Sequence, residues 1–148
     1  MQGSEDKGTM QDKNISGKQL LEKYEEKRKY PRIIVDCPVS MVLPNSKEVE
    51  AQAHDVSPGG LQLRSGKQTA RILNAENEKL KQGTKSDFEV NFILPLEGRQ
   101  EKLQIRCKLA YTVKLEENYY AIGLQFTRVE GSNRKILRRF IESSMEPL

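Results

Sequence analysis

The sequence predicts a mainly β protein whose six antiparallel strands close into a β-barrel, with a short N-terminal helix, a possible inserted helix and a C-terminal helix. Two observations lead to this fold class. Apolar and polar residues alternate in six stretches between residues 33 and 130, which is typical of strands with one buried face. The chain has 148 residues, of which 36% are hydrophobic, and this suits one modest core. A sheet closed around a single core satisfies both observations.

The N-terminal part is predicted to be a disordered tail followed by one short helix. Residues 1–16 are polar and show no periodicity, so they bury too little apolar surface to offset the entropy of ordering. Residues 16–19 (SGKQ) have the S-x-x-Q form of a capping box, and apolar residues recur at helical spacing directly after them. We therefore expect a helix over residues 17–27.

A loop at residues 27–32 is expected to follow this helix. Pro31 lacks a backbone N–H and restricts Tyr30 to extended conformations, so the helix ends before it. The loop carries Arg28 and Arg32. A guanidinium is a planar fork that pairs with phosphate oxygens or with N7 and O6 of a purine. These two arginines are therefore candidate ligand-binding residues.

The barrel is expected over residues 33–130. Pro38 cannot donate to a strand ladder, so the first strand is predicted to be an edge strand or a bulged one. The longest stretch, residues 103–115, is expected to keep one apolar face throughout, with basic residues on the other face. The expected apolar faces are Val35, Cys37, Val39, Met41 and Leu43; Val49, Ala51 and Ala53; Leu61 and Leu63; Phe88, Val90, Phe92 and Leu94; Leu103, Ile105, Cys107, Leu109, Tyr111, Val113 and Leu115; and Tyr120, Ile122, Leu124 and Phe126.

Two further segments have helical character. Residues 69–81 contain helix formers and end near Gly83, which predicts an inserted helix or a long ordered loop. Residues 131–148 are predicted to form a C-terminal helix that begins with a capping sequence. Its apolar stripe is expected to pack on the barrel, although the same stripe would also suit a partner protein. The stripe consists of Ile136, Leu137, Phe140 and Ile141.

Residues 57–60 (SPGG) are predicted to form a tight turn of type II. Proline presets φ at the second position of such a turn, and glycine accepts the positive φ of the third. The turn would hold Asp55 and Ser57 near a strand end. A carboxylate there can accept hydrogen bonds from N1–H and the exocyclic amino group of a guanine, and the serine hydroxyl and nearby amides add contacts.

The residues of this chain do not favour an enzyme or a metal protein. The arginine loop and the turn contain no nucleophile with a neighbouring base, and His54 is the only histidine. Cys37 and Cys107 are far apart and belong to no CxxC motif, so reduced thiols are expected without zinc or a disulfide. No run approaches the roughly 20 apolar residues of a membrane-spanning helix. We therefore expect a cytoplasmic protein without a metal or cofactor.

The two candidate segments together resemble the PilZ family. In that family an RxxxR loop precedes a barrel that carries (D/N)xSxxG about one strand pair later. Here Arg28 and Arg32 are followed by Asp55, Ser57 and Gly60. The resemblance implies a six-stranded β-barrel that binds cyclic di-GMP. It also implies that the two arginines contact phosphates and guanines, and that the other three residues form the barrel side of the site.

The likeness covers about residues 27–129. Residues 119–126 (YYAIGLQF) are similar to the closing strand of the family, with its Gly-x-x-Phe ending. By the same resemblance, Gly59 belongs to the ligand-binding turn, and Lys27 lies at a position that influences ligand stoichiometry. Whether one cyclic di-GMP or an intercalated pair binds remains open. The segment 69–81 is longer than the usual connection of the family.

The expected function is therefore that of a bacterial second-messenger receptor or adaptor, connected with motility or biofilm regulation. Its arginine loop is expected to become ordered when cyclic di-GMP binds, which changes a surface for a downstream protein partner. One alternative is a PilZ-like scaffold without a ligand, anchored through Ile136, Leu137 and Phe140. Another is a small-barrel nucleic-acid binder, which the net charge of +4, the outward lysines of residues 102–114 and Tyr119 would support.

Overall fold

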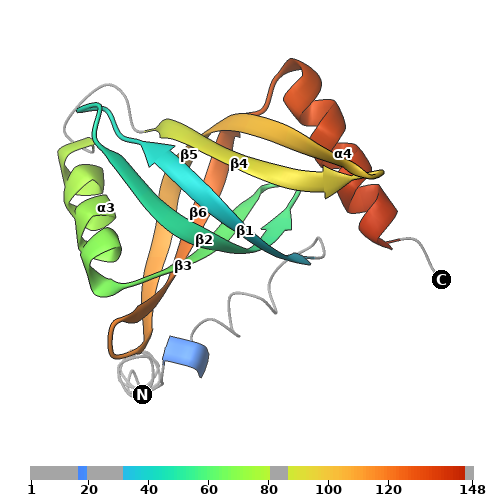
Figure 1. Cartoon of the computed structure of the whole chain (residues 1–148). Helices are drawn as coiled ribbons and strands as arrows, with labels where there is room; N and C mark the ends of the chain where they lie inside the picture. The colour runs from blue at the N-terminus through green and yellow to red at the C-terminus, as the bar shows by residue number, and fades with distance from the viewer. Residues whose placement is uncertain (1–16, 20–31, 81–86, 146–148) are drawn as a thin grey trace, which may run out of the picture.

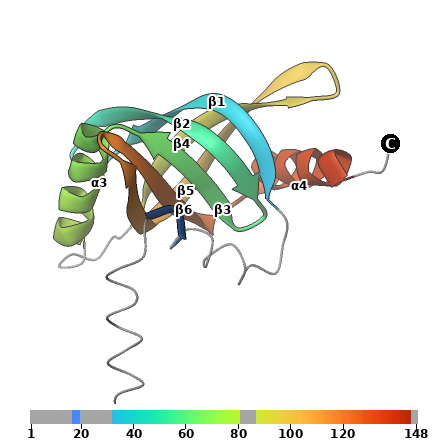
Figure 2. The ribbon, with the colours of Figure 1, turned by 90° about the horizontal axis from the view of Figure 1, so that it is seen from below.

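Six antiparallel strands close into a barrel in the order β1-β2-β3-β6-β5-β4, which confirms the predicted fold class (Figure 1). The computed structural model describes residues 17–19, 32–80 and 87–145. The strands are β1 (Ile33–Val42), β2 (Glu48–Ser57), β3 (Gly60–Ser65), β4 (Phe88–Leu96), β5 (Arg99–Glu116) and β6 (Tyr119–Arg128), and the helices are α3 (Lys67–Leu80) and α4 (Gly131–Met145). The two helices lie at opposite ends of the barrel (Figures 1 and 2).

The core of the barrel consists of the alternating residues that the sequence pattern indicates. Side chains from all six strands are less than 4% exposed, among them Met41, Leu63, Val90, Ile105 and Ile122. Burial of such a side chain stabilises the fold by about 1.5–3 kcal/mol. Val35 and Cys37, which were also expected inside, are partly buried and pack against this core.

The strand β5 departs from its predicted pattern. The expected single apolar face over residues 103–115 is wrong beyond Leu109, because the register shifts between Leu109 and Tyr111. The extra residue turns the following side chains to the other face of the sheet. Leu109 opposes Leu124 in the core, whereas Val113 opposes Ala121 on the outside. Tyr111, Val113 and Leu115 thus form a second, outer cluster with Ala121.

The strand β1 is bulged, which is one of the two forms predicted from Pro38. Its register with β2 shifts between Ile34 and Cys37. Its pairing with β4 begins only at Val39. Pro38 therefore lies next to the bulge and outside the β1–β4 ladder, a position where a strand tolerates a residue without an N–H.

The helices agree with one of the predicted alternatives in each case. Residues 67–80 form α3, so the inserted segment is a helix, and it buries Ala70 and Leu73. In α4 the residues Leu137, Phe140 and Ile141 are buried, and the helix contacts β4 and β5. These three residues are thus part of the core, so Leu137 and Phe140 are not available as anchors for a partner protein, whereas Ile136 is only partly buried.

The N-terminal predictions fall mostly outside the described residues. The tail at residues 1–16, the rest of the helix predicted over 17–27 and the loop residues Lys27 and Arg28 are not among them. Residues 17–19 are helical, and Gly17 lies directly against β5, where an added Cβ would be 1.7 Å from the carbonyl oxygen of Lys114. No helix within the described ranges is long and apolar enough to cross a membrane.

Candidate functional site

The β2–β3 hairpin carries the DVSPGG segment. Ser57 pairs with Gly60 across the turn formed by Pro58 and Gly59. The predicted type II turn is wrong, because Gly59 does not have the positive φ that this turn needs at its third position. The primed hairpin turns are also excluded, since Pro58 holds φ negative. The carbonyl of Gly59 accepts a hydrogen bond of 2.8 Å from the amide of Phe126, which ties the turn to β6.

Gly60 is required by the close approach of β3 to β6. A Cβ at this position would lie 2.1 Å from the carbonyl oxygen of Leu124. Any side chain would therefore push the two strands apart at the point where Gly60 pairs with Gln125. The glycine of the DxSxxG motif thus has a structural reason in this chain, apart from any contact that it makes with a ligand.

Four residues form a row across the outer face of the barrel. The register shift between Ala53 and Asp55 places Asp55 opposite Gln62. Gln62 in turn lies opposite Gly123, and Gly123 opposite Tyr111. Asp55 and Gln62 are only 3% and 1% exposed although they point outward. Other side chains must therefore cover them.

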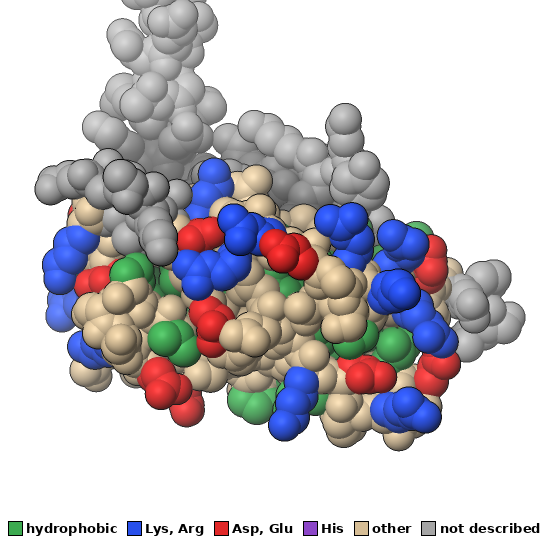
Figure 3. Space-filling view, turned by 90° about the horizontal axis from the view of Figure 1, so that it is seen from above, with side chains coloured by type: hydrophobic (Ala, Val, Ile, Leu, Met, Phe, Trp, Pro, Cys, Tyr) green, Lys and Arg blue, Asp and Glu red, His purple; other side chains and the backbone are tan. Residues whose placement is uncertain are grey.

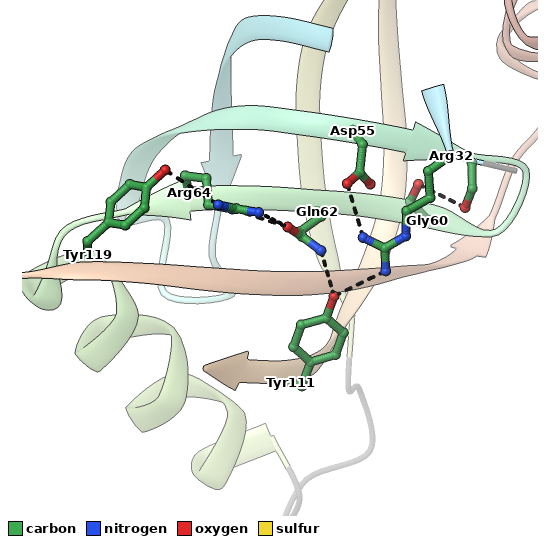
Figure 4. Close-up of polar contacts among 8 residues, drawn as sticks. Arg32, Asp55, Gly60, Gln62, Arg64, Tyr111 and Tyr119 are labelled. Atoms are coloured by element: carbon green, nitrogen blue, oxygen red, sulfur yellow. Dashed lines mark hydrogen bonds and ion pairs between the residues drawn. The ribbon is translucent and has the colours of Figure 1, made fainter. Parts of the chain in front are cut away.

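Arg32 covers Asp55. It immediately precedes β1, and its Nη1 donates to Oδ2 of Asp55 at 3.0 Å, with the two side chains 9% and 4% exposed. Its Nη2 lies 3.5 Å from the hydroxyl of Tyr111. Its Nε is buried and has no hydrogen-bond partner among the described residues. Figure 4 shows the guanidinium between the carboxylate and the phenol.

The charge of Arg32 is maintained in this environment. Burial by itself lowers the pKa of the guanidinium, but the hydrogen bond to Tyr111 and the charge of Asp55 outweigh that effect and raise the pKa. Arg32 and Asp55 are thus an ion pair with little access to water, on the outer face of the barrel.

The hydrogen-bond network continues from Tyr111 along β3. Nε2 of Gln62 donates to the Tyr111 hydroxyl at 3.1 Å. Oε1 of Gln62 accepts from Nε and Nη2 of Arg64 at 3.1 and 2.6 Å. Nη1 of Arg64 lies 3.4 Å from the hydroxyl of Tyr119, and the guanidinium is over the Tyr119 ring at 5.8 Å from its centre. The network therefore reaches from Arg32 to Tyr119 (Figure 4).

Two hollows flank this network on the outer face. One, of about 240 Å³, lies beside the turn and is lined by Gly59, Gly60, Tyr111 and Gly123 among others. The other, of about 560 Å³, is lined by residues that include Arg64 and Tyr119. A third hollow of about 600 Å³, between β1, β4, β5 and the start of α4, contains none of the predicted site residues.

The structure brings part of the predicted site together. Arg32 meets Asp55, and Ser57 is buried at the turn with its Oγ 3.5 Å from the carbonyl oxygen of Gly60. Gly59 is exposed at the tip of the turn. Lys27 and Arg28 lie outside the described residues, so Arg32 is the only residue of the loop 27–32 whose position the structure describes.

Sequence reasoning missed Gln62, Arg64 and Tyr111 as members of this network. The signal for the first two was available, because positions 60, 62 and 64 alternate along one strand and therefore share the face of Asp55. Tyr111 was assigned to the core, since the bulge in β5 leaves no mark in the alternation. Tyr119 was considered only as an exposed aromatic residue for a nucleic-acid binder.

The two thiols and the described acidic residues form no reactive or metal-binding centre. Burial raises the pKa of Cys107 to about 12 and also raises that of Cys37. Neither thiol is therefore prepared for nucleophilic chemistry near neutral pH. Within the described parts of the chain, no group of three or more His, Cys, Asp or Glu residues is placed to hold a metal ion.

A family model described as the PilZ domain matches residues 26–143 of this chain. Among solved structures, the Bacillus subtilis inhibitor of motility (MotI/DgrA) shares 11% identity at a TM-score of 0.57, with 80% of this chain and 50% of that chain covered. The present chain thus spans half the length of that protein. The search of curated proteins gave no match.

Two further similar structures were solved with a ligand. The PilZ domain of YcgR from Escherichia coli with c-di-GMP has 14% identity, a TM-score of 0.51, and coverage of 79% of this chain and 90% of that one. The K. pneumonia MrkH–c-di-GMP complex has 16% identity, a TM-score of 0.52, and coverage of 79% and 52%. At such identities the likeness of the structures is one of fold.

Proposed function

Since this chain belongs to the PilZ domain family, we propose that it is a receptor for cyclic di-GMP, and not an enzyme. The observation that carries the proposal is the buried contact between Arg32 and Asp55. It joins one residue of the RxxxR segment to one residue of the DxSxxG segment on the same outer face. Solved relatives of the same fold are described as complexes with c-di-GMP, which supports this choice of ligand.

The proposed binding step is an exchange of partners at the ion pair. The carboxylate of Asp55 is covered by Arg32, so a guanine reaches it only when Arg32 moves. The guanine then offers N1–H and its amino group to Asp55, while a phosphate offers its oxygens to Arg32. Both charged groups keep a partner, which avoids the large cost of leaving one buried charge alone.

The turn supplies the remaining contacts in this proposal. Ser57 contributes its hydroxyl, and Gly59 and Gly60 contribute the floor of the hollow of about 240 Å³ beside the network. Nothing lies within 4 Å of the position that a Cβ on Gly59 would take, so a flat base can approach the turn backbone there. Arg28 would act with Arg32 on the phosphates, and Lys27 would influence whether one or two ligands bind.

We also propose that ligand binding changes the N-terminal segment and thereby a surface for a downstream protein. Tyr111 supports this step, because its hydroxyl lies at Arg32 while its ring belongs to the outer cluster with Val113. Gly17 packs against this same part of β5. An unchanged hydrogen-exchange protection of residues 17–32 on addition of cyclic di-GMP would argue against it.

The basic residues of β5 do not favour the nucleic-acid alternative. Arg106 pairs with Asp87 at 2.7 Å, and Lys114 with Glu117 at 3.0 Å. Figure 3 shows acidic side chains among the basic ones on the face that it presents. We therefore propose a protein partner instead of DNA or RNA. We also propose that the protein acts in the cytoplasm.

Calorimetric titration with cyclic di-GMP tests the proposal, with GTP and cyclic GMP as control ligands. Saturable binding is expected for the native chain, weakened roughly tenfold or more in Arg28→Ala and in Arg32→Ala, because each loses charge-assisted hydrogen bonds. Arg99→Ala serves as a matched control, since Arg99 is exposed at the distant β4–β5 hairpin. A native chain that binds no cyclic di-GMP would refute the proposal.

A further inference from the structure

The hollow of about 560 Å³ on the outer face lies next to the proposed site but contains none of its motif residues. Its lining includes Arg64 and Tyr119, together with Ile34, Gln52 and His54. Arg64 lies two residues along β3 from Gln62, the direct partner of Asp55 across the ladder. Two residues along a strand correspond to about 7 Å. The hollow is therefore within reach of a ligand held at Asp55.

Arg64 is held in place by neutral partners. Its Nε and Nη2 both donate to Oε1 of Gln62, so the carboxamide occupies one edge of the guanidinium. Its Nη1 lies near the hydroxyl of Tyr119. Within the described residues no carboxylate forms an ion pair with Arg64. The side chain is thus fixed in orientation, and no carboxylate among the described residues neutralises its positive charge.

The other end of this guanidinium is suited to a guanine. A guanidinium has five N–H groups, and the contacts to Gln62 and Tyr119 use three of them. One N–H on each Nη remains for O6 and N7 of a guanine, and the two make a parallel fork when the Tyr119 contact uses the Nη1 hydrogen on the Cδ side. Adenine presents an amino group in place of O6, so it offers this fork only one acceptor.

Tyr119 adds an aromatic face to the same hollow. The residue is 39% exposed, and its ring supports the guanidinium of Arg64 by a cation–π contact. The remaining exposed part of the ring is available to a planar base. Stacking on an aromatic side chain contributes to base binding without strong base preference, so selectivity would come from the fork of Arg64.

From this arrangement we infer that Arg64 and Tyr119 form a second base-binding subsite, specific for guanine, next to the site at Asp55 and Ser57. This inference rests on the proposed function. The guanine is either the second base of the cyclic di-GMP held at Asp55 or a base of a second molecule. In both cases Arg64 reads the base, and Gln62, which lies between the two subsites, positions Arg64.

The test compares cyclic di-GMP with 3′,3′-cyclic GMP-AMP, which carries one guanine and one adenine. The native chain is expected to prefer cyclic di-GMP by about tenfold or more, as for a bidentate contact to guanine. In Arg64→Ala both the affinity and this preference are expected to fall. Arg64→Lys retains the charge but loses the fork, so its preference should fall although more of its affinity remains. Arg99→Ala should resemble the native chain.

Variants of Tyr119 and the number of ligands bound per chain test the subsite further. Tyr119→Phe keeps the ring and is expected to bind nearly as the native chain does, whereas Tyr119→Leu is expected to lose about tenfold in affinity. If the native chain binds one ligand, lower affinity in Arg64→Ala assigns the subsite to the second base of that molecule. If it binds two, a fall to one in Arg64→Ala assigns the subsite to the second molecule.

The outcomes that overturn the inference are distinct from failure of the proposed function. If Arg32→Ala abolishes binding but Arg64→Ala retains both affinity and preference, the subsite is rejected and the receptor function stands. Equal binding of the two cyclic dinucleotides by the native chain likewise rejects the subsite. No binding of cyclic di-GMP by the native chain rejects both. Matching thermal unfolding of Arg64→Ala and the native chain excludes misfolding as the cause of a loss.

Discussion

The ring of Tyr111 occupies the space that a side chain on Gly123 would fill. A Cβ on Gly123 would lie 2.2 Å from the nearest ring carbon of Tyr111. The two residues are direct partners across β5 and β6. This relationship brings the Tyr111 hydroxyl to Gln62 and Arg32. Gly123 therefore determines the position of the Tyr111 hydroxyl in the candidate site, because it leaves room for the Tyr111 ring.

Gly123→Ala should displace Tyr111 and weaken both the fold and ligand binding. A forced side-chain shift of this kind costs about 1–3 kcal/mol of unfolding free energy. Gly59→Ala is the matched control for stability, because nothing lies within 4 Å of the added Cβ, and Arg99→Ala is the control for binding, because Gly59 itself belongs to the proposed site. Urea unfolding and calorimetry measure the two effects. Equal stability of the two variants would contradict the prediction.

Tyr111→Phe should keep the ring and lose only the hydroxyl contacts. Nε2 of Gln62 then lacks its acceptor, and Arg32 loses one of its two partners in the network. We expect a loss of about 1–3 kcal/mol in unfolding free energy, as for a buried donor left unsatisfied. Cyclic di-GMP affinity should fall as well, since Arg32 is less well positioned. A variant that unfolds at the same urea concentration as the native chain would show that the hydroxyl contributes nothing.

The pair formed by Asp87 and Arg106 should make the fold sensitive to acid. The hydrogen bond from Arg106 holds the pKa of Asp87 below its usual 3.8, and Thr127 adds to this. Because the folded-state pKa is depressed, the carboxylate stabilises the fold above its unfolded-state pKa, and this contribution disappears as the pH falls through the folded-state pKa.

The unfolding free energy of the native chain is therefore expected to decrease below about pH 4, and less steeply in Asp87→Asn. Urea unfolding between about pH 5 and pH 2.5 measures the slopes. Glu142→Gln, a change of an exposed acidic residue on α4, should keep the native slope. If the unfolding free energy of Asp87→Asn falls with pH as steeply as that of the native chain, the pair of Asp87 and Arg106 is not a source of acid sensitivity.

The stripe of α4 should behave as part of the core. Phe140 is 7% exposed, and Phe140→Ala is expected to cost about 3–5 kcal/mol in unfolding free energy, as for other large core truncations. Arg138→Ala, on the exposed side of the same helix, should change stability by less than about 0.5 kcal/mol. If Phe140→Ala is neutral in thermal and urea unfolding, the helix is not packed on the barrel as described.

The alternation of apolar residues was sufficient to predict the six strands, their inner faces and the closed sheet. It failed in β5, because apolar residues continue past Leu109 and nothing in their spacing marks the bulge before Tyr111. The motif spacing predicted that Asp55 and Ser57 lie together near a turn. It could not predict that Arg32 covers Asp55, since this depends on where the chain enters β1.

The side-chain network beyond Asp55 also escaped prediction for a physical reason. Gln62 and Arg64 are polar residues at outward positions of a strand, and most such residues face water and have no specific partner. Here the bulges in β2 and β5 align Asp55, Gln62 and Tyr111 in one row. Registers of this kind depend on contacts between strands far apart in the sequence.

The short ladder between β1 and β4 has a consequence for the movement of Arg32. Only Val39, Ser40, Met41 and Val42 pair with β4, so the first half of β1 is held on one side, by β2. Pro38 stands where the one-sided half meets the two-sided half. The segment that carries Arg32 is thus held in the sheet by its pairs with β2 alone, so a movement of Arg32 away from Asp55 would leave the ladder between β1 and β4 intact.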